Sequence, residues 1–165
     1  MNYIVLDLEW NQSADGKAYT NSRIPFEIIQ IGAVKLDENF SEISQFDRYI
    51  RPAVYTKLHD KVQEILNVTI EELTCIGHDF TDVANDFIRW CGDDYIFCTW
   101  GQTDLTELQR NFDYYNIEYN FPKPFRPDSQ KIQPTGQPTC VLTQTVPPSR
   151  RLIYTAEAVK HDPRP

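Results

Sequence analysis

The sequence lacks long hydrophobic runs, paired cysteines and a basic leader. No stretch of its 165 residues approaches the roughly 18 consecutive apolar residues of a transmembrane helix, so no membrane association is expected. The short apolar run at residues 3–10 follows no basic segment and is interrupted by Asp7 and Glu9, which is not typical of a signal peptide. The four cysteines form no CxxC pair, and we expect free, buried thiols in a cytoplasmic protein.

Positive charge is scarce in most of the chain. Residues 1–121 carry 9 Lys and Arg against 21 Asp and Glu, a net charge of −12. Residues 122–165 carry 7 against 3, a net charge of +4. An acidic body argues against broad non-specific binding to nucleic acid, but divalent cations bound at an acidic site would reverse the local charge.

Proline is unevenly distributed as well, since nine of the 11 prolines lie at or beyond Pro122. This density disfavours continuous helix or central strand through most of that segment, with residues 151–160 as the one stretch that could be helical. We therefore expect a folded domain at residues 1–121 and a Pro-rich, basic C-terminal segment at residues 122–165 that is irregular or altered. The hydrophobic fraction of 41% suits one globular domain.

Apolar patterning within residues 1–121 predicts four strands. A nearly continuous apolar run places the first at residues 1–10. The second, rich in Ile and Val, is expected at residues 26–36, the third at residues 43–50 before Pro52, and the fourth at residues 95–100. The short connections between the first three predict an antiparallel meander.

Apolar residues at intervals of three and four predict helices at residues 58–66, 80–91 and 104–115. Gly92 is expected to end the second of these, and Thr103 or Asp104 to start the third. The pattern Thr69-Ile70-Glu71-Glu72 matches a capping box and predicts a further short helix.

Two carboxylates lie on the first predicted strand. Asp7 and Glu9 are two residues apart, so their side chains share one face of the strand, among apolar neighbours. Two unpaired carboxylates are costly to bury together, and a divalent metal such as Mg²⁺ or Mn²⁺ would offset their repulsion. The structural alternative is that either residue pairs with an arginine or caps a backbone turn.

Asp104 is the natural third ligand. It follows the strand that ends near Trp100 and opens a helix, which places it at the carboxyl end of a strand, where the sites of sheet-and-helix folds gather. An Asp at a helix start is often only a cap, so this prediction depends on the Asp7 and Glu9 pair.

Three segments stand out together: Asp7-Leu8-Glu9-Trp10, the run FEIIQIGAV at residues 26–34 and the run WGQTD at residues 100–104. They resemble motifs of the DEDD 3′–5′ exonucleases, most closely those of the KapD-like branch of the DEDDh group. The resemblance covers residues 1–121. It implies an α/β, RNase H-like fold, in which a mixed sheet with three antiparallel first strands is flanked by helices.

The resemblance also implies a function. It points to a metal-dependent 3′–5′ exonuclease that hydrolyses single-stranded RNA or DNA, RNA being favoured, from its 3′ end to 5′-mononucleotides. Asp7, Glu9 and Asp104 would hold two Mg²⁺ or Mn²⁺ ions, one activating the attacking water and the other stabilising the leaving 3′ oxygen. A phosphatase that uses the same carboxylates on small substrates is a further option.

The third motif of this family is missing from the sequence. It supplies a His as general base and an Asp five residues later, and no such pair follows Asp104. The only late histidine, His161, is either a displaced base or a solvated tail residue. The chain is therefore expected to be truncated or altered near its C-terminus, or to be a non-catalytic nucleic-acid-binding or interaction module that keeps the exonuclease fold.

Other residues receive lesser roles. Trp10 either stacks on a terminal base or belongs to the core. Glu27, by resemblance, approaches the terminal nucleotide, the alternative being a surface charge. His59 is expected on a helix surface and His78 in the turn before the helix at residues 80–91. Trp100 is expected in the core.

Overall fold

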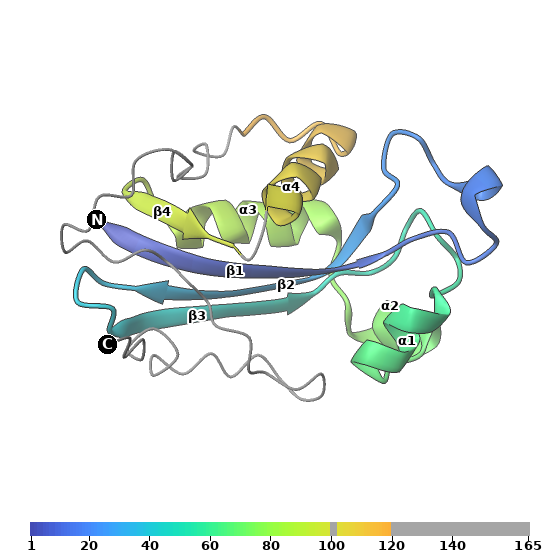
Figure 1. Cartoon of the computed structure of the whole chain (residues 1–165), viewed down its shortest axis with the longest axis horizontal. Helices are drawn as coiled ribbons and strands as arrows, with labels where there is room; N and C mark the ends of the chain where they lie inside the picture. Colours follow the sequence, from blue (N-terminus) through green and yellow to red (C-terminus); the bar gives the residue numbers. More distant parts are fainter. Residues whose placement is uncertain (100–101, 120–165) are drawn as a thin grey trace, which may run out of the picture.

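The computed structural model describes residues 1–99 and 102–119 of the chain. Strands β1 (Asn2–Asn11), β2 (Glu27–Leu36), β3 (Glu42–Tyr49) and β4 (Tyr95–Cys98) form one sheet in the order β3-β2-β1-β4 (Figure 1). The first three strands pair antiparallel, and β4 runs parallel to β1. The predicted mixed sheet with an antiparallel meander is confirmed.

Strand β1 presents different chemistry on its two faces. Ile4, Leu6 and Leu8 are buried and belong to the main hydrophobic core, together with side chains of two helices. The alternate residue Val5 packs on the opposite face in a smaller cluster. Because side chains alternate along a strand, Asp7 and Glu9 continue the face of Val5, and they are half-buried there.

Two helices cover the face of the sheet that carries Leu6 and Leu8. Helix α3 (Phe80–Cys91) buries residues at intervals of three and four, and Gly92 ends it with a φ of 73°. Helix α4 (Gln102–Tyr114) buries Leu105, Leu108 and Phe112 against the same core. The predicted flanking helices are therefore confirmed.

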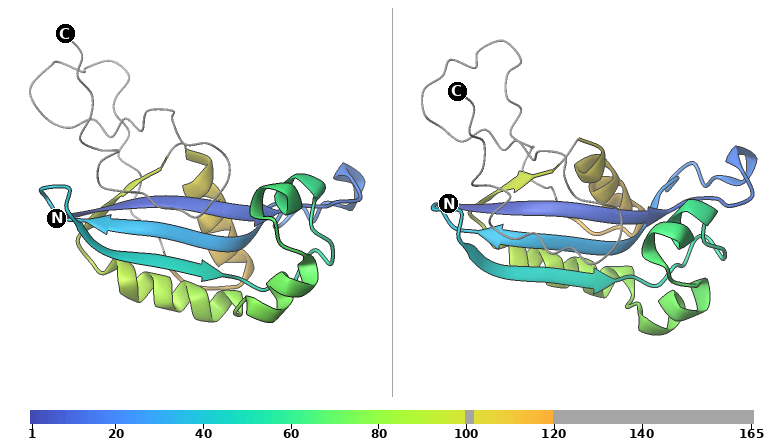
Figure 2. Two further views of the ribbon diagram at one scale, coloured as in Figure 1. Left: turned by 90° about the horizontal axis from the view of Figure 1, so that it is seen from below. Right: turned by 60° about the horizontal axis from the view of Figure 1, so that its bottom comes forward.

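Helices α1 (Asp60–Leu66) and α2 (Ile70–Ile76) lie at the end of the sheet where β3 finishes (Figure 2). Leu58 and Leu73 pack with Ile29 of β2 in a separate buried cluster. The predicted capping box is present, because the Thr69 hydroxyl accepts from the backbone N–H of Glu72 and the Glu72 carboxylate accepts from that of Thr69.

Several expectations need correction. Helix α4 begins at Gln102, so Asp104 lies in its first turn and neither Thr103 nor Asp104 starts it. Strand β4 ends at Cys98, and Trp100 lies outside the described residues. His59 is the N-cap of α1, where its Nδ1 accepts from the backbone N–H of Lys61, so it does not lie on a helix surface. His78 precedes α3, as predicted.

The cysteines match the prediction only in part. Cys75, Cys91 and Cys98 are free, but Cys75 is exposed rather than buried, and Cys140 lies outside the described residues. The predictions for the segment 122–165 fall outside them too. Within residues 1–99 and 102–119, no helix is both long enough and apolar enough to span a bilayer.

Candidate active site

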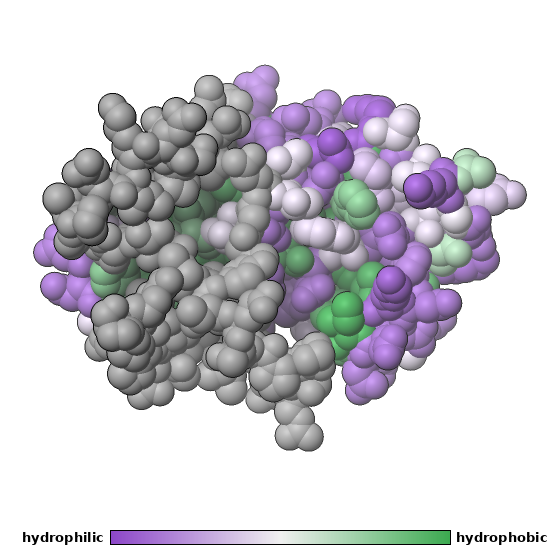
Figure 3. Space-filling view, viewed as in Figure 1, coloured by the Kyte–Doolittle hydropathy of each residue, from purple (hydrophilic) through white to green (hydrophobic). Residues whose placement is uncertain are grey.

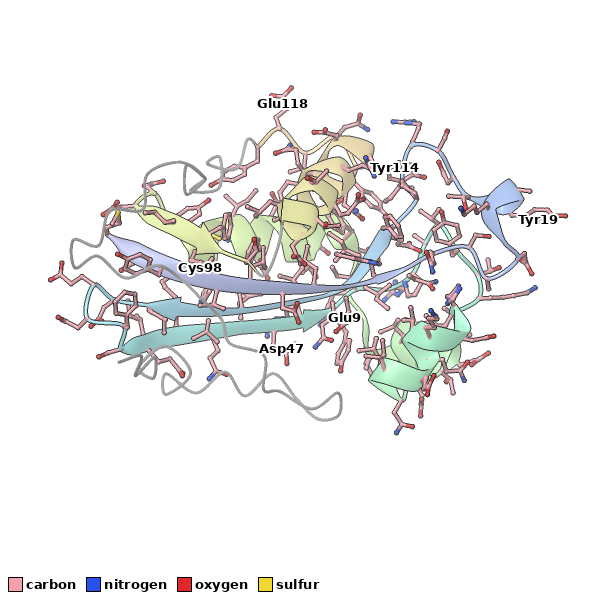
Figure 4. The ribbon with its side chains drawn as sticks, in the orientation of Figure 1. Glu9, Tyr19, Asp47, Cys98, Tyr114 and Glu118 are labelled. Atoms are coloured by element: carbon pink, nitrogen blue, oxygen red, sulfur yellow. The ribbon has the colours of Figure 1, made fainter. Side chains whose placement is uncertain are left out.

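Asp7 and Glu9 lie near the carboxyl end of β1, where Figure 4 labels Glu9. Residue Gly32 of β2 is directly opposite Asp7, and Gln30 is opposite Glu9. Gly32 contributes no side chain beside Asp7, and a glycine inside a strand often marks a place where another group approaches closely. The Gln30 side chain donates to the Asp47 carboxylate at 2.8 Å, so it is held towards β3.

Asp104 reaches this part of β1 from helix α4. Strand β4 pairs with β1 only as far as Val5, so among the described residues no strand lies beside the edge of β1 beyond that residue on this side. The backbone N–H of Asn2 donates to the backbone carbonyl of Asp94, just before β4. Every second residue of a strand points its backbone N–H to the same side. The N–H of Leu8 faces this edge, and the Asp104 carboxylate accepts a hydrogen bond from it.

The three carboxylates affect one another electrostatically. Burial raises the pKa of Glu9 to about 7, with further contributions from Asp7 and Asp104. Burial and the charge of Asp7 raise the pKa of Asp104 to about 6, although backbone hydrogen bonds from Leu8 and from Asp104 itself act in the opposite direction. The structure therefore brings Asp7, Glu9 and Asp104 together, from one strand and one helix.

These surroundings test the structural alternatives. Within residues 1–99 and 102–119, neither Glu9 nor Asp104 forms an ion pair with an arginine or lysine. Glu9 therefore gains nothing from a fixed positive charge, and its raised pKa reflects an uncompensated cost. The bond from Leu8 to Asp104 joins two elements, so Asp104 does more than cap its own helix.

A divalent cation fits this donor set, since it would offset the repulsion between the three groups. As they are placed, the described His, Cys, Asp and Glu side chains include no group of three that could hold a metal ion alone. Mg²⁺ is usually held by one or two carboxylates together with water and substrate phosphates. If Asp7, Glu9 and Asp104 hold a metal ion, water and substrate phosphates must complete its coordination.

Trp10 follows Glu9 at an irregularity of the sheet. Glu9 pairs with Gln30 but Trp10 pairs with Ile28, so β2 has one extra residue at this point. Trp10 is half-buried, packs against the main core and makes a tilted ring contact with Phe26, with centroids 5.7 Å apart. The structure thus supports the core alternative for most of the Trp10 side chain.

Glu27 has a different environment from either expectation. It is 1% exposed, and its carboxylate accepts hydrogen bonds from three consecutive backbone N–H groups, at Ala53 (2.6 Å), Val54 (2.8 Å) and Tyr55 (3.1 Å). Burial raises its pKa, and these three bonds oppose that shift. The surface-charge alternative is wrong, and a side chain this buried offers a nucleotide no surface, so we assign Glu27 a structural role.

Sequence reasoning missed Asn111, which fixes α4 against β2. This residue is fully buried, accepts from the backbone N–H of Ile28 at 3.0 Å and donates to the carbonyl of Phe26 at 2.9 Å. It lies seven residues after Asp104, so both are on the same face of α4. The available signal was a polar residue between the apolar positions Leu108 and Phe112 of the predicted helix.

The expected general base is not part of this geometry. His59 caps α1 and His78 precedes α3, and neither affects the pKa of Glu9 or Asp104. His161 lies outside the described residues.

Comparisons with solved structures support the fold. The nuclease domain of 3′hExo, a DEDDh family member bound to rAMP, superposes with a TM-score of 0.60 at 20% identity, over 72% of this chain and 62% of that one. Cell-death related nuclease 4 gives 0.58 at 20% identity, over 72% and 41%. Exonuclease I gives 0.57 at 15% identity, over 72% and 25%. The chain thus spans less than two thirds of each of these structures, and at such identities the likeness shows the fold, which is RNase H-like.

A family model supplies the stronger evidence. No curated protein matches this chain. The model of the exonuclease family RNase_T matches residues 4–133, a range that contains Asp7 and Glu9 of β1 and the first turn of α4 with Asp104. The resemblance seen in the sequence is therefore confirmed at the level of the exonuclease family and the RNase H-like fold, and one of the similar structures is that of a DEDDh family member, although the KapD-like branch remains a prediction. This chain belongs to the RNase_T exonuclease family.

Proposed function

We propose that this protein is a metal-dependent 3′–5′ exonuclease that hydrolyses single-stranded RNA or DNA to 5′-mononucleotides. The observation that carries the proposal is the convergence of Asp7, Glu9 and Asp104 in a chain of the exonuclease family. The preference for RNA rests on weaker support. The solved structures include 3′hExo bound to rAMP and a 3′-exonuclease that recognises the 3′ end of a histone mRNA stem-loop.

Asp7, Glu9 and Asp104 would hold Mg²⁺ or Mn²⁺ at this place. When bound, such ions polarise a phosphodiester and lower the pKa of a coordinated water. The chain itself supplies orientation. The strand fixes the direction of the Asp7 and Glu9 side chains, and the N–H of Leu8 fixes that of Asp104. The position of Trp10, directly after Glu9, leaves the exposed part of its ring available to a terminal base.

The direct test is hydrolysis of a single-stranded oligonucleotide with Mn²⁺, with and without a chelator. Labels at the 3′ and 5′ ends in separate reactions report the polarity, and RNA and DNA of one sequence report the sugar preference. Asp7→Asn and Glu9→Gln should each reduce the rate by about a hundredfold or more if the carboxylates hold the metal. The matched control is Glu38→Gln, an exposed carboxylate in the turn between β2 and β3, which should retain full activity.

A second function is favoured by one observation. No His with an Asp five residues later follows Asp104 in the sequence, so the family's usual general base is missing. A nucleic-acid-binding or interaction module that keeps the fold without catalysis would account for this. Oligonucleotide binding without metal-dependent cleavage would support the module and refute the enzyme. Release of phosphate from mononucleotides, without cleavage of oligomers, would instead indicate a phosphatase.

A further inference from the structure

Two loops extend beyond the carboxyl end of β1, next to the site carboxylates. The first, residues 12–26, contains the short 3-10 helix η1 (Lys17–Tyr19), and the second, residues 51–59, leads into α1. Figure 1 shows both at the same end of the molecule. We call them together the rim loops. Because Glu9 is near the end of β1, they are the nearest described loops along the strand axis from the site.

The rim loops are anchored from inside the protein. The Glu27 carboxylate holds three successive N–H groups of the second loop. Its neighbour across the sheet, Asn11, is fully buried, donates from its amide to the carbonyl of Lys57 at 2.9 Å and accepts from the backbone N–H of His59 at 2.9 Å. The residue pair Asn11 and Glu27 therefore fixes the second loop at residues 53–55 and again at residues 57–59.

The two loops are also joined to each other. The buried Tyr55 hydroxyl donates to the carbonyl of Ile24 at 3.0 Å and accepts from the backbone N–H of Asn21 at 3.1 Å. Lys57 and Asp15 form an ion pair at 3.0 Å across the loops. Loops held in this way lose little conformational entropy when they bind a ligand, which distinguishes a preorganised surface from an ordinary connection.

The exposed chemistry of the rim loops differs from that of the acidic body around them. Lys17, Arg23 and Lys57 are exposed, and Lys61 adds a fourth exposed cation in the first turn of α1. These are four of the nine Lys and Arg within residues 1–121, a region of net charge −12. On the face shown in Figure 3, hydrophilic side chains dominate this end of the molecule.

One aromatic side chain stands among these cations. Tyr19 is 71% exposed, and Figure 4 shows it pointing away from the body of the protein. The Arg23 guanidinium is held 5.3 Å from the centre of the Tyr114 ring, so its position is defined by α4. Exposed aromatic rings interleaved with cations are the typical surface of a protein that binds single-stranded nucleic acid, because bases stack and phosphates pair.

We propose that the rim loops bind the single-stranded nucleic acid upstream of the nucleotide that is cut. Phosphates would pair with Lys17, Arg23 and Lys61, and a base would stack on Tyr19. The Lys57–Asp15 pair would chiefly join the loops. This proposal rests on the proposed function and deepens it, since it names a second contact region for the same substrate.

The test separates binding from catalysis. Fluorescence anisotropy with a single-stranded oligonucleotide of about 12 nucleotides, in chelator and over a range of salt concentrations, measures affinity without metal chemistry. Tyr19→Ala should weaken binding by about tenfold, which is the usual effect of losing one stacked base. The double variant K17Q/R23Q should reduce the slope of log affinity against log salt by about 1.4, for two lost phosphate contacts.

Matched controls remove the same charges elsewhere. Arg48 on β3 and Arg89 on α3 are both exposed, so R48Q/R89Q changes the net charge equally. Equal losses of affinity and slope in the two double variants would refute the proposal, as would wild-type protein that does not bind the oligonucleotide. With active enzyme, the rim variants should raise the KM for the long substrate, whereas R48Q/R89Q should leave it unchanged. If wild-type protein binds through the rim but cleaves nothing, the proposed catalysis fails and this inference stands.

Discussion

At the residue scale, the ionised carboxylates of Glu9 and Asp104 destabilise the folded protein, so its stability depends on pH. Their pKa values, raised to about 7 and about 6, mean that the folded protein binds these protons more tightly than the unfolded chain does. The stability that this proton binding contributes is complete below the unfolded pKa and is lost as the pH rises through the folded pKa. We expect the metal-free protein to lose stability between the ordinary value of 4.5 and about pH 7.

The Glu9→Gln variant tests whether ionisation of Glu9 causes this pH dependence, because glutamine cannot ionise. Its free energy of unfolding, measured by urea denaturation in chelator at about pH 5 and about pH 8, should change less with pH than that of the wild type. At the higher pH the variant should be equally or more stable. A variant that is less stable than wild type at both values would show that Glu9 has a structural partner. Glu38→Gln serves as the exposed control.

For Glu27, which is also a buried carboxylate, we expect the opposite effect, namely that its replacement destabilises the protein. Glu27→Gln turns an amide N–H₂ towards three N–H donors, so at least one of them loses its acceptor. We expect a loss of about 2–4 kcal/mol in the free energy of unfolding, measured by denaturant titration near neutral pH. A change within about 0.5 kcal/mol, the usual effect of a surface substitution, would contradict the structural role.

At the element scale, Asn111 connects α4, which carries Asp104, to β2. Asn111→Ala removes the acceptor for the N–H of Ile28 and the donor for the carbonyl of Phe26. We expect a destabilisation of about 2–3 kcal/mol and a loss of activity at temperatures where the variant is still folded, because α4 is free to shift. Thermal unfolding and the cleavage assay together check this. Asn85→Ala, on the exposed face of α3, should change neither result.

Replacing either of two glycines at helix ends should lower the free energy of unfolding, but for different reasons. A Cβ on Gly77, which follows α2, would lie 2.5 Å from the backbone nitrogen of Arg51, and backbone cannot move aside cheaply. Gly92 has open space around it but a φ of 73°. We expect Gly77→Ala to cost more than about 3 kcal/mol, and Gly92→Ala, with its ψ of −158°, about 1–3 kcal/mol. Urea denaturation of the two variants side by side gives the comparison, and a reversed order would contradict it.

At the scale of the whole molecule, metal binding should raise the stability of the folded protein. A ligand that binds only the folded state raises the free energy of unfolding, by about 2.7 kcal/mol at a hundred times its Kd. We expect Mn²⁺ to raise the Tm of the wild type and to have much less effect on Asp7→Asn. Unchanged Tm values in wild-type protein would count against a metal site that forms without substrate. Because the Tm measurement does not require catalysis, its result does not depend on the missing His motif.

The sequence by itself determined what depends on local pattern. Alternation along β1 placed Asp7 and Glu9 on one face, because successive side chains of a strand point to opposite sides. The spacing of apolar residues located the helix Phe80–Cys91, and the motif at Thr69 located α2. The family resemblance followed from the same short segments.

Tertiary structure decided what depends on partners distant in the sequence. The three backbone N–H groups that donate to Glu27 are 26–28 residues away, and Asn111 bonds to Ile28 across 83 residues. No local pattern distinguishes such a residue from a surface charge or a polar helix position. The same is true of Asp104, which is oriented by the N–H of Leu8 because β4 stops short of that edge of β1. Sequence therefore identified the carboxylates, and the fold determined how they are held together.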